Sequence, residues 1–346
     1  MSPISAPSKF LVTGANGFVA AWVIRALLEK GHAVRGTVRS VKKGDYLRNI
    51  FKTYGDKFEL VIVEDITKEG AFDDAVKGID IVAHTASPFQ FKADDPDDFI
   101  APAVNGTVGI LESVKRHGLT VKRIIVLSSA STIVDPFNTA PVIIYDESDW
   151  NETSHQLVEQ QGKNAPVPFW YIASKTLAEK AAWDFVEKNK SEINFDLVTL
   201  VPPYIFGPPI HEVHSVSELN QSLSDFHDTL VKGVPYNFPE IAHGFIDVRD
   251  LAEAHVRAAE VADAGGKRFI ISGGSFHWQD IMDTAAEIQP PVVENLAKGT
   301  PGIGRPISKN FTLKAGRAEQ ILNMKWRPLQ DTIRDTLVAF KEQGFA

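Results

Sequence analysis

The sequence predicts an α/β protein in which a doubly wound parallel sheet is covered by helices on both faces and followed by a smaller C-terminal lobe. Short apolar segments alternate with helical patterns through most of the N-terminal half of the 346-residue chain. Such alternation requires parallel strands joined by crossover helices. The content of 44% hydrophobic and 23% charged residues is that of an ordinary globular protein, and the length permits a large core.

The first strand, turn and helix stand at the start of the chain. Residues 10–12 are apolar, Gly14 and Gly17 follow, and a helical pattern begins near Asn16. These glycines let the backbone turn tightly and approach a pyrophosphate, which the free N–H groups of the helix would bind. The spacing departs from Gly-x-Gly-x-x-Gly, but the strand before and the helix after favour a dinucleotide site over a plain structural turn. We assign Gly14, Asn16, Gly17, Phe18 and Val19 to this site.

The second strand, expected at residues 33–38, is followed by cations. Arg39 ends it, and Lys43 lies within reach. NAD-selective sites usually have a carboxylate here that binds the ribose 2′-OH, whereas two cations suit a 2′-phosphate. The sequence therefore predicts NADPH as the cofactor; the alternative is an exposed arginine beside a solvated lysine.

Three further strands are expected at residues 58–63, 80–85 and 123–128, with helical patterns between them. Ligands of open parallel sheets lie beyond the carboxyl ends of the strands, so the polar residues there should converge on one crevice. Asp65 would lie near the adenine ring, although turn formation is an equally good explanation for it. The cofactor residues assigned from these strand ends are Asp65, Ile66, Thr85, Ala86, Ser87 and Ser128.

The chain changes character after the fifth strand. Residues 135–168 contain four prolines and a polar middle, and a long helix follows at about 171–188. A sixth strand is expected at 195–200 and a late strand at 269–272, which returns to the sheet. We assign residues 1–207, with a return segment at about 245–272, to the cofactor domain, and residues 208–244 and 273–346 to the smaller lobe.

Tyr171 and Lys175 lie four residues apart and therefore on one face of the long helix. A phenol has a pKa near 10, which a nearby ammonium and a positively charged nicotinamide would lower. Tyr171 could then give a proton to a carbonyl that receives a hydride, and Lys175 could hold the ribose hydroxyls. Ser129 could donate a hydrogen bond to the same carbonyl oxygen. A Tyr-x-x-x-Lys pair is common on helices, but with the glycine turn and Ser129 it predicts a catalytic triad.

The composition argues against several other classes of function. The chain has no Cys, so disulfides, thiolate metal sites and cysteine nucleophiles are excluded. A net charge of −8 argues against a nucleic-acid partner, and no apolar run is long enough to cross a membrane. His211 and His214 have no evident third ligand, and we expect no metal. The polar N-terminus is not a signal peptide, and we expect a cytoplasmic monomer or homodimer.

Several motifs together resemble the extended short-chain dehydrogenases/reductases over nearly the whole chain. They are residues 13–17, 127–130, 171–175 and 202–208. Residues 84–89, 145–150 and 245–250 are similar to the dihydroflavonol reductase and cinnamoyl-CoA reductase branch, and most to its fungal aldehyde, ketone and methylglyoxal reductases. The resemblance implies a Rossmann domain, a substrate lobe and NADPH as hydride donor. It also implies a catalytic triad of Ser129, Tyr171 and Lys175, and places Pro202, Tyr204 and Ile205 beside the nicotinamide.

The expected substrate is a small or medium hydrophobic carbonyl compound. Dihydroflavonol reductases carry an Asn where this chain has Val134, and cinnamoyl-CoA reductases carry a Cys where it has Ile172. Both departures remove features that serve those substrates. The assigned substrate residues are Phe89, Ser129, Ser131, Tyr204, Phe206 and Pro209. The alternatives are dihydroflavonol or cinnamoyl-CoA reductase-like activity, a nucleotide-sugar epimerase or dehydratase, and a non-catalytic NADP-sensing protein.

Overall fold

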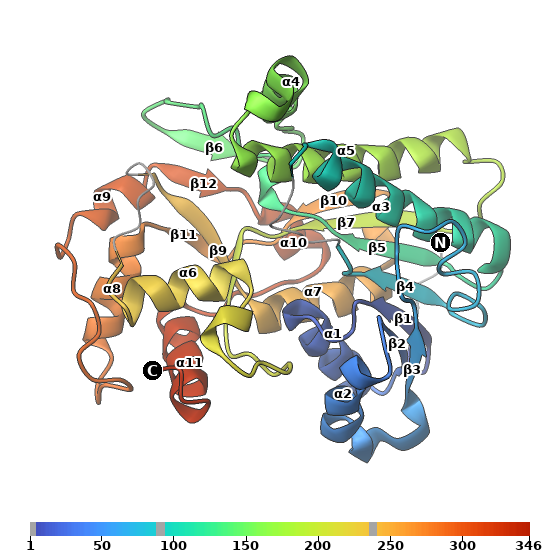
Figure 1. Ribbon diagram of the computed structural model, residues 1–346, viewed down its shortest axis with the longest axis horizontal. Helices are drawn as coiled ribbons and strands as arrows, with labels where there is room; N and C mark the ends of the chain where they lie inside the picture. The colour runs from blue at the N-terminus through green and yellow to red at the C-terminus, as the bar shows by residue number, and fades with distance from the viewer. Residues whose placement is uncertain (1–4, 88–93, 235–240) are drawn as a thin grey trace.

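A parallel sheet forms the centre of the molecule (Figure 1). The computed structural model describes residues 5–87, 94–234 and 241–346. In these residues the sheet has the strand order β10-β7-β5-β4-β1-β2-β3, and every neighbouring pair is parallel. The strands are β1 (Lys9–Thr13), β2 (Ala33–Val38), β3 (Phe58–Ile62), β4 (Ile81–His84), β5 (Arg123–Leu127), β7 (Asp196–Val201) and β10 (Lys267–Ile270). The order reverses beside β1, so the predicted doubly wound sheet is confirmed.

Helices cover both faces of this sheet (Figure 1). Helices α1 (Phe18–Glu29) and α7 (Val248–Glu260) pack on one face, and α3 (Asp97–His117) and α5 (Val167–Lys188) on the other. Side chains alternate between the two faces along each strand. In β1, Phe10 and Val12 face the α1 side, while Leu11 faces the α3 side. All three are buried, as expected for a strand covered on both faces.

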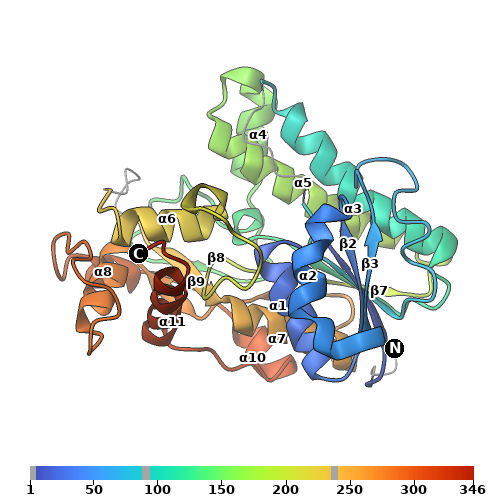
Figure 2. The ribbon, with the colours of Figure 1, turned by 60° about the horizontal axis from the view of Figure 1, so that its bottom comes forward.

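The C-terminal part builds a third layer of helices beside two small sheets. Figures 1 and 2 both show α6, α8 and α11 grouped at one end of the molecule. The small-sheet strands are β8 (Tyr204–Phe206), β9 (His243–Asp247) and β11 (Gly274–Phe276), and separately β6 (Ile143–Tyr145) with β12 (Phe311–Leu313). The remaining α-helices are α2 (Asp45–Ile50), α4 (Glu152–Gln161), α6 (Gln221–Leu230), α8 (Trp278–Glu287), α9 (Gly304–Ser308), α10 (Gly316–Ile321) and α11 (Leu329–Glu342). Short 3₁₀ helices are η1 (Lys42–Gly44), η2 (Lys52–Lys57), η3 (Ala130–Thr132), η4 (Gly162–Asn164), η5 (Val216–Glu218) and η6 (Ala262–Ala264).

Two connections differ from the expectation. Between β3 and β4 the chain forms turns where a helical pattern was expected, and Gly70 and Gly78 there have φ of +70° and +69°. A left-handed residue interrupts a right-handed helix, which explains the difference. Residues 135–168, expected as an irregular connection, contain β6 and α4. Asn151 begins α4, because its side chain accepts a hydrogen bond from the Ser154 N–H over 3.0 Å.

The division of the chain into a cofactor domain and a smaller lobe stays a proposal. β10 pairs with β7, so the predicted return segment rejoins the large sheet. β8 pairs with β9, which pairs with β11, and β6 pairs with β12. Segments on both sides of residue 207 therefore contribute to each small sheet. In the described part of the chain, no helix has both the length and the apolar character needed to span a bilayer.

Candidate active site

The glycine turn joins β1 to α1. Gly14 has a φ of +67°, and a Cβ atom there would lie 3.1 Å from the Ala86 Cα. The Gly17 N–H donates to the Gly14 carbonyl over 2.9 Å, and α1 begins one residue later. Within the described residues no side chain caps this helix start, so its first N–H groups are available to an anion. The assigned residues Gly14, Asn16, Gly17, Phe18 and Val19 all belong to this turn and the helix start.

Thr13 ties the end of β1 to the end of β4. Its hydroxyl lies 3.0 Å from His84 Nδ1 and accepts hydrogen bonds from the N–H groups of Thr85 and Ala86 over 3.1 and 3.0 Å. Burial lowers the pKa of His84 to about 3, so this imidazole is neutral near pH 7. Thr85 and Ala86 are thereby held beside the glycine turn, where the prediction placed the middle of the cofactor.

Arg39 and Lys43 are exposed cations after β2, and the ion pairs of the described residues include neither of them. Asp65 lies after β3, and its carboxylate accepts hydrogen bonds from the Thr67 N–H and hydroxyl over 2.9 and 2.7 Å. These bonds, and to a smaller extent Arg39, lower the pKa of Asp65. The structure therefore shows that Asp65 stabilises a turn, whereas its contact with an adenine ring stays a proposal. Ile66 is buried.

Ser129, Tyr171 and Lys175 lie together at the carboxyl end of the sheet. Ser129 follows β5, and its side chain forms a hydrogen bond with that of Tyr171. Lys175 lies one turn after Tyr171 on α5, with its Nζ 5.7 Å from the centroid of the tyrosine ring. The same Nζ donates to Ser87 Oγ over 2.8 Å. The structure thus brings the three proposed catalytic side chains together and joins them to a proposed cofactor residue.

Burial shifts the pKa values of Tyr171 and Lys175 in opposite directions. It raises the pKa of Tyr171 above the ordinary 10.0, although the hydrogen bond with Ser129 acts to lower it. It lowers the pKa of Lys175 from 10.5 to about 8. The sequence predicts a lowered pKa for Tyr171, because an ammonium lies nearby. In the protein without cofactor this pKa is raised instead, because charging a buried phenol is unfavourable. A raised pKa keeps the proton on Tyr171 at neutral pH, which is the state that a proton donor needs.

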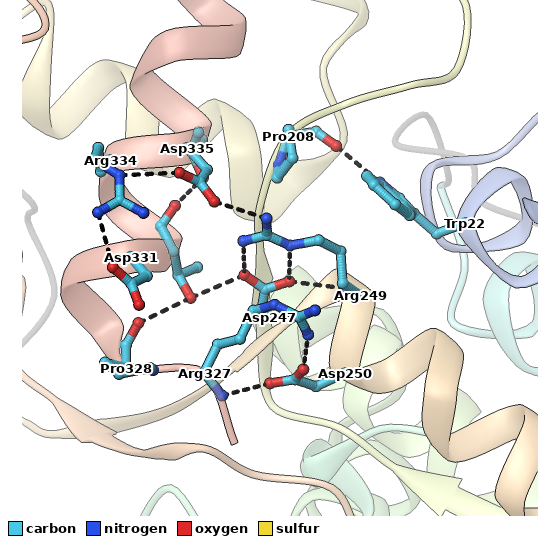
Figure 3. Close-up of polar contacts among 12 residues, drawn as sticks. Trp22, Pro208, Asp247, Arg249, Asp250, Arg327, Pro328, Asp331, Arg334 and Asp335 are labelled. Atoms are coloured by element: carbon cyan, nitrogen blue, oxygen red, sulfur yellow. Dashed lines mark hydrogen bonds and ion pairs between the residues drawn. The ribbon is translucent and has the colours of Figure 1, made fainter. Parts of the chain in front are cut away.

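Residues 202–209 form a loop segment that includes the short strand β8, and it is tied to its surroundings at both ends. The Ala130 N–H donates to the Pro202 carbonyl over 2.8 Å, which joins the loop to the turn that follows Ser129. The Trp22 indole N–H donates to the Pro208 carbonyl over 2.8 Å (Figure 3). Because Trp22 lies on α1, the helix of the glycine turn also supports this loop.

Asp247, at the end of β9 and the start of α7, joins these elements to α11 (Figure 3). Its buried carboxylate accepts hydrogen bonds from Arg249 Nε and Nη2 over 2.9 and 2.7 Å, and from Thr332 Oγ1 over 2.9 Å. Arg249 Nη1 also donates to Asp335 over 2.7 Å. This ionic network fixes the C-terminal helix against β9 and so against β8, which carries Tyr204 and Ile205.

The proposed substrate residues lie in different environments. Ser131 Oγ donates to Ser129 Oγ over 2.9 Å. Tyr204 is half-buried, and its ring lies edge-on to Phe276 with centroids 5.8 Å apart. Phe206 is fully buried in the same aromatic cluster, which makes its ring a core side chain. Pro209 is buried, and Phe89 lies outside the described residues.

His211 and His214 differ in environment. His211 is buried, which lowers its pKa to about 4, whereas His214 is exposed and its Nε2 lies 3.3 Å from Glu212. Among the residues that the structure describes, no group of three His, Asp or Glu side chains is arranged to hold a metal ion.

Comparisons with known proteins identify the family. The sequence profile of the NAD-dependent epimerase/dehydratase family matches residues 10–272. The chain belongs to this family. A ketoreductase of Aspergillus niger is 36% identical over 351 residues, which cover 98% of this chain and 99% of the relative. An NADPH-dependent methylglyoxal reductase of Saccharomyces cerevisiae is 35% identical over 333 residues, which cover 94% and 96%.

A solved structure supports the same placement within the family. The crystal structure of the yeast methylglyoxal/isovaleraldehyde reductase Gre2, complexed with NADPH, matches 98% of this chain and all of that chain. The two are 35% identical, with a TM-score of 0.86. The family resemblance and the Rossmann-type fold predicted from sequence motifs are confirmed by these similarities.

Two side chains near this site were not singled out from the sequence. Trp22 supports the 202–209 loop through a hydrogen bond to Pro208, and a contact between positions so far apart leaves no local sequence signal. Glu179 follows Lys175 by four residues on α5 and is buried, with Ser128 Oγ donating to it over 2.5 Å. The repeated four-residue spacing was a usable signal for Glu179, because it places the carboxylate on the same helix face.

Proposed function

We propose that this chain is an NADPH-dependent carbonyl reductase, which reduces aldehydes and ketones to alcohols with Tyr171 as proton donor. The hydrogen bond between Ser129 and Tyr171, beside Lys175, is the observation that carries the proposal. Two side chains that can both hydrogen-bond one carbonyl oxygen suit acid-assisted reduction. The names of the Aspergillus and yeast relatives are consistent with this activity.

The residues at the glycine turn fit a dinucleotide. The N–H groups at the start of α1 would hold the pyrophosphate, and Arg39 and Lys43 would bind a 2′-phosphate as unpaired, exposed cations. When bound, NADPH supplies the hydride. Lys175 and Ser87, already hydrogen-bonded to each other, would contact the ribose and the middle of the cofactor. Pro202, Tyr204 and Ile205 would lie beside the nicotinamide.

The protein's own groups handle the proton. Tyr171 is protonated at neutral pH and can donate to the oxygen of a carbonyl group, while Ser129 donates a hydrogen bond to the same oxygen. Ser131 donates to Ser129 Oγ, which leaves the Ser129 proton free to point elsewhere. The charged Lys175 then favours the phenolate that forms when Tyr171 has lost its proton.

The test is NADPH oxidation with a panel of aliphatic aldehydes, aromatic ketones and keto esters. Turnover of simple carbonyl compounds supports the proposal. NADPH binding without turnover of any of them would favour a cofactor-sensing protein, and interconversion of nucleotide sugars would favour an epimerase or dehydratase. Turnover restricted to dihydroflavonols or CoA thioesters would favour the plant-type activities. A cytoplasmic location and a monomeric or homodimeric state remain part of the proposal.

A further inference from the structure

Glu179 is a buried carboxylate on the helix that carries the proposed catalytic residues. Tyr171, Lys175 and Glu179 follow one another at four-residue intervals on α5, which places them along one helix face. The Glu179 side chain is 1% exposed. A buried carboxylate is costly unless its oxygens are fully hydrogen-bonded, so its partners indicate what it holds in place.

One oxygen of this carboxylate binds the chain around Ser129. The Ser128 hydroxyl donates to Glu179 Oε2 over 2.5 Å, and the Thr132 hydroxyl lies 2.9 Å from the same oxygen. Thr132 Oγ1 is also 2.9 Å from the Ser129 carbonyl. Ser129 therefore lies between two residues, Ser128 and Thr132, whose hydroxyl groups contact the same carboxylate oxygen.

The other oxygen binds the body of the protein. Glu179 Oε1 accepts hydrogen bonds from Thr199 Oγ1 on β7 and from Arg268 Nε on β10, each over 2.8 Å. Arg268 is itself buried and donates to the carbonyls of Glu147 and Asp149 over 2.9 Å. Trp183 Nε1 also donates to Oε1 over 3.3 Å, and Arg268 Nη2 reaches Thr132 Oγ1 over 3.2 Å and Glu179 Oε2 over 3.5 Å. The carboxylate and Arg268 together thus link the turn that carries Ser129 to two strands and a loop.

A small cavity of about 20 Å³ lies at the end of β5, among Lys175, Ser128 and Glu179. Ser128 and Glu179, which are hydrogen-bonded to each other, both line it. The carboxylate network therefore joins the Ser129 turn to α5 at the edge of this cavity, beside Lys175.

We propose that Glu179, held by Arg268, is a positioning residue that keeps Ser129 within hydrogen-bonding distance of Tyr171. The proposal rests on the reductase function proposed above, because it assigns Glu179 to the geometry of that reaction. Glu179 acts through Ser128 and Thr132 and needs no contact with the substrate.

A second ion pair in the same sheet, formed by the buried Arg123 and the partly buried Asp196, provides a control. Arg123 Nε and Nη2 donate to the two carboxylate oxygens of Asp196 over 2.6 and 2.9 Å, at the opposite, amino-terminal ends of β5 and β7. Arg123 is 3% exposed. Asp196→Asn therefore disturbs the ion pair of a buried arginine, at the ends of β5 and β7 that lie away from Ser129.

Glu179→Gln is the principal variant. Its amide nitrogen cannot accept the short hydrogen bond that Arg268 Nε donates to Oε1, so it takes the Oε2 position, where only the longer contact with Arg268 Nη2 is lost. There it faces Ser128 and Thr132. We expect kcat to fall at least ~10-fold, since small misplacements of reacting groups are costly, while KM for NADPH changes less than about twofold. Asp196→Asn should lower Tm comparably and leave kcat near the wild-type value. Wild-type kcat in Glu179→Gln, or equal falls in both variants, would overturn the proposal.

Two milder variants keep the proposal testable if Glu179→Gln does not fold. Thr132→Val and Thr199→Val each remove one buried hydroxyl that contacts Glu179. Only Thr132 belongs to the turn that carries Ser129. We expect the larger fall in kcat for Thr132→Val; equal effects, or a larger fall for Thr199→Val, would contradict the proposed role.

The Tyr171 titration separates this inference from the proposed function. The hydrogen bond with Ser129 lowers the Tyr171 pKa, so Thr132→Val, which changes no charge, should raise that pKa while Thr199→Val leaves it unchanged. The measurement uses carbon NMR of labelled tyrosine, with Tyr171→Phe to assign the signal, and needs no turnover. If the wild type reduces no carbonyl compound but the Tyr171 pKa responds, the function fails and the positioning role stands. An unchanged Tyr171 pKa in Thr132→Val contradicts the positioning role.

Discussion

Burial acts on Tyr171 and Lys175 in a way that suits reduction. The phenol keeps its proton because its pKa is raised, and the ammonium of Lys175, with a pKa of about 8, remains mostly charged at pH 7. The donor therefore holds a proton, and a cation that favours the product phenolate lies one helical turn away.

Replacing the proton donor should separate binding from chemistry. Tyr171→Phe removes only the acidic oxygen, so NADPH binding should persist while kcat falls by at least ~10²-fold, as for a lost general acid. NADPH binding is measured by fluorescence and turnover by NADPH absorbance. Near-normal turnover in this variant would rule out the proposed mechanism.

The pKa of Lys175 predicts a pH dependence of stability. Its folded value of about 8 lies below the ordinary 10.5, so between these pH values the unfolded chain binds more protons. The wild type should therefore gain stability relative to Lys175→Met as the pH rises through this window, as measured by urea unfolding. Lys163→Met is the control, because Lys163 is exposed and Asp95 raises its pKa, so no such gain should appear. If the stability difference between the wild type and Lys175→Met is the same at every pH, the lowered pKa of Lys175 is refuted.

Arg39 should select between the two nicotinamide cofactors. If it binds the 2′-phosphate, Arg39→Ala should raise KM for NADPH by at least ~10-fold and change KM for NADH much less, because NADH lacks this phosphate. Lys52→Ala removes another exposed cation, farther from the end of β2, and should change neither KM. If Arg39→Ala raises KM for NADPH and for NADH equally, Arg39 does not bind the 2′-phosphate.

Helix α11 depends on one buried carboxylate. Asp247 binds Arg249 and Thr332, and Arg249 bridges to Asp335 (Figure 3). Asp247→Asn breaks a buried pair and should destabilise the protein by about 3 kcal/mol in urea unfolding. Asp331→Asn removes an exposed partner of Arg334 and should cost less than about 0.5 kcal/mol. Similar values for the two variants would show that the buried network is not what holds α11.

Prediction of the elements was most accurate where the pattern was local. β2 was expected and found at residues 33–38, but α5 begins at Val167, four residues before the expected start. Prolines 166 and 168 made this segment look irregular, whereas Pro fits the first turn of a helix, where an N–H needs no partner. β6 was missed because its three residues are held only by β12, more than 160 positions later in the sequence.

Across the whole molecule, the apolar surroundings of the proposed cleft predict the order of substrates. Val134 and Ile172 stand where relatives of other specificity carry polar or thiol groups. We expect aliphatic and aromatic aldehydes and ketones to have a higher kcat/KM than dihydroflavonols or CoA thioesters, since area burial is the main attraction. Val134→Asn should bring the kcat/KM for dihydroflavonols closer to the values for simple aldehydes and ketones. If dihydroflavonols or CoA thioesters have the highest measured kcat/KM, the enzyme belongs with the plant-type reductases instead.

The sequence by itself was sufficient for the parallel sheet, the glycine turn and the shared face of Tyr171 and Lys175. The strands, the turn and the helix face each depend on residues close together in the sequence, and hydrophobic periodicity records such local geometry. Parallel pairing then follows from the alternation of strands with helices. The hydrogen bond between Ser129 and Tyr171, the pKa direction of the phenol and the Glu179–Arg268 pair emerge only when distant segments meet. Arg268 lies 89 residues after Glu179, and no local pattern encodes that contact or the burial that it creates. Desolvation, which outweighs the hydrogen bond from Ser129 in setting the Tyr171 pKa, is a property of the packed molecule and not of a motif.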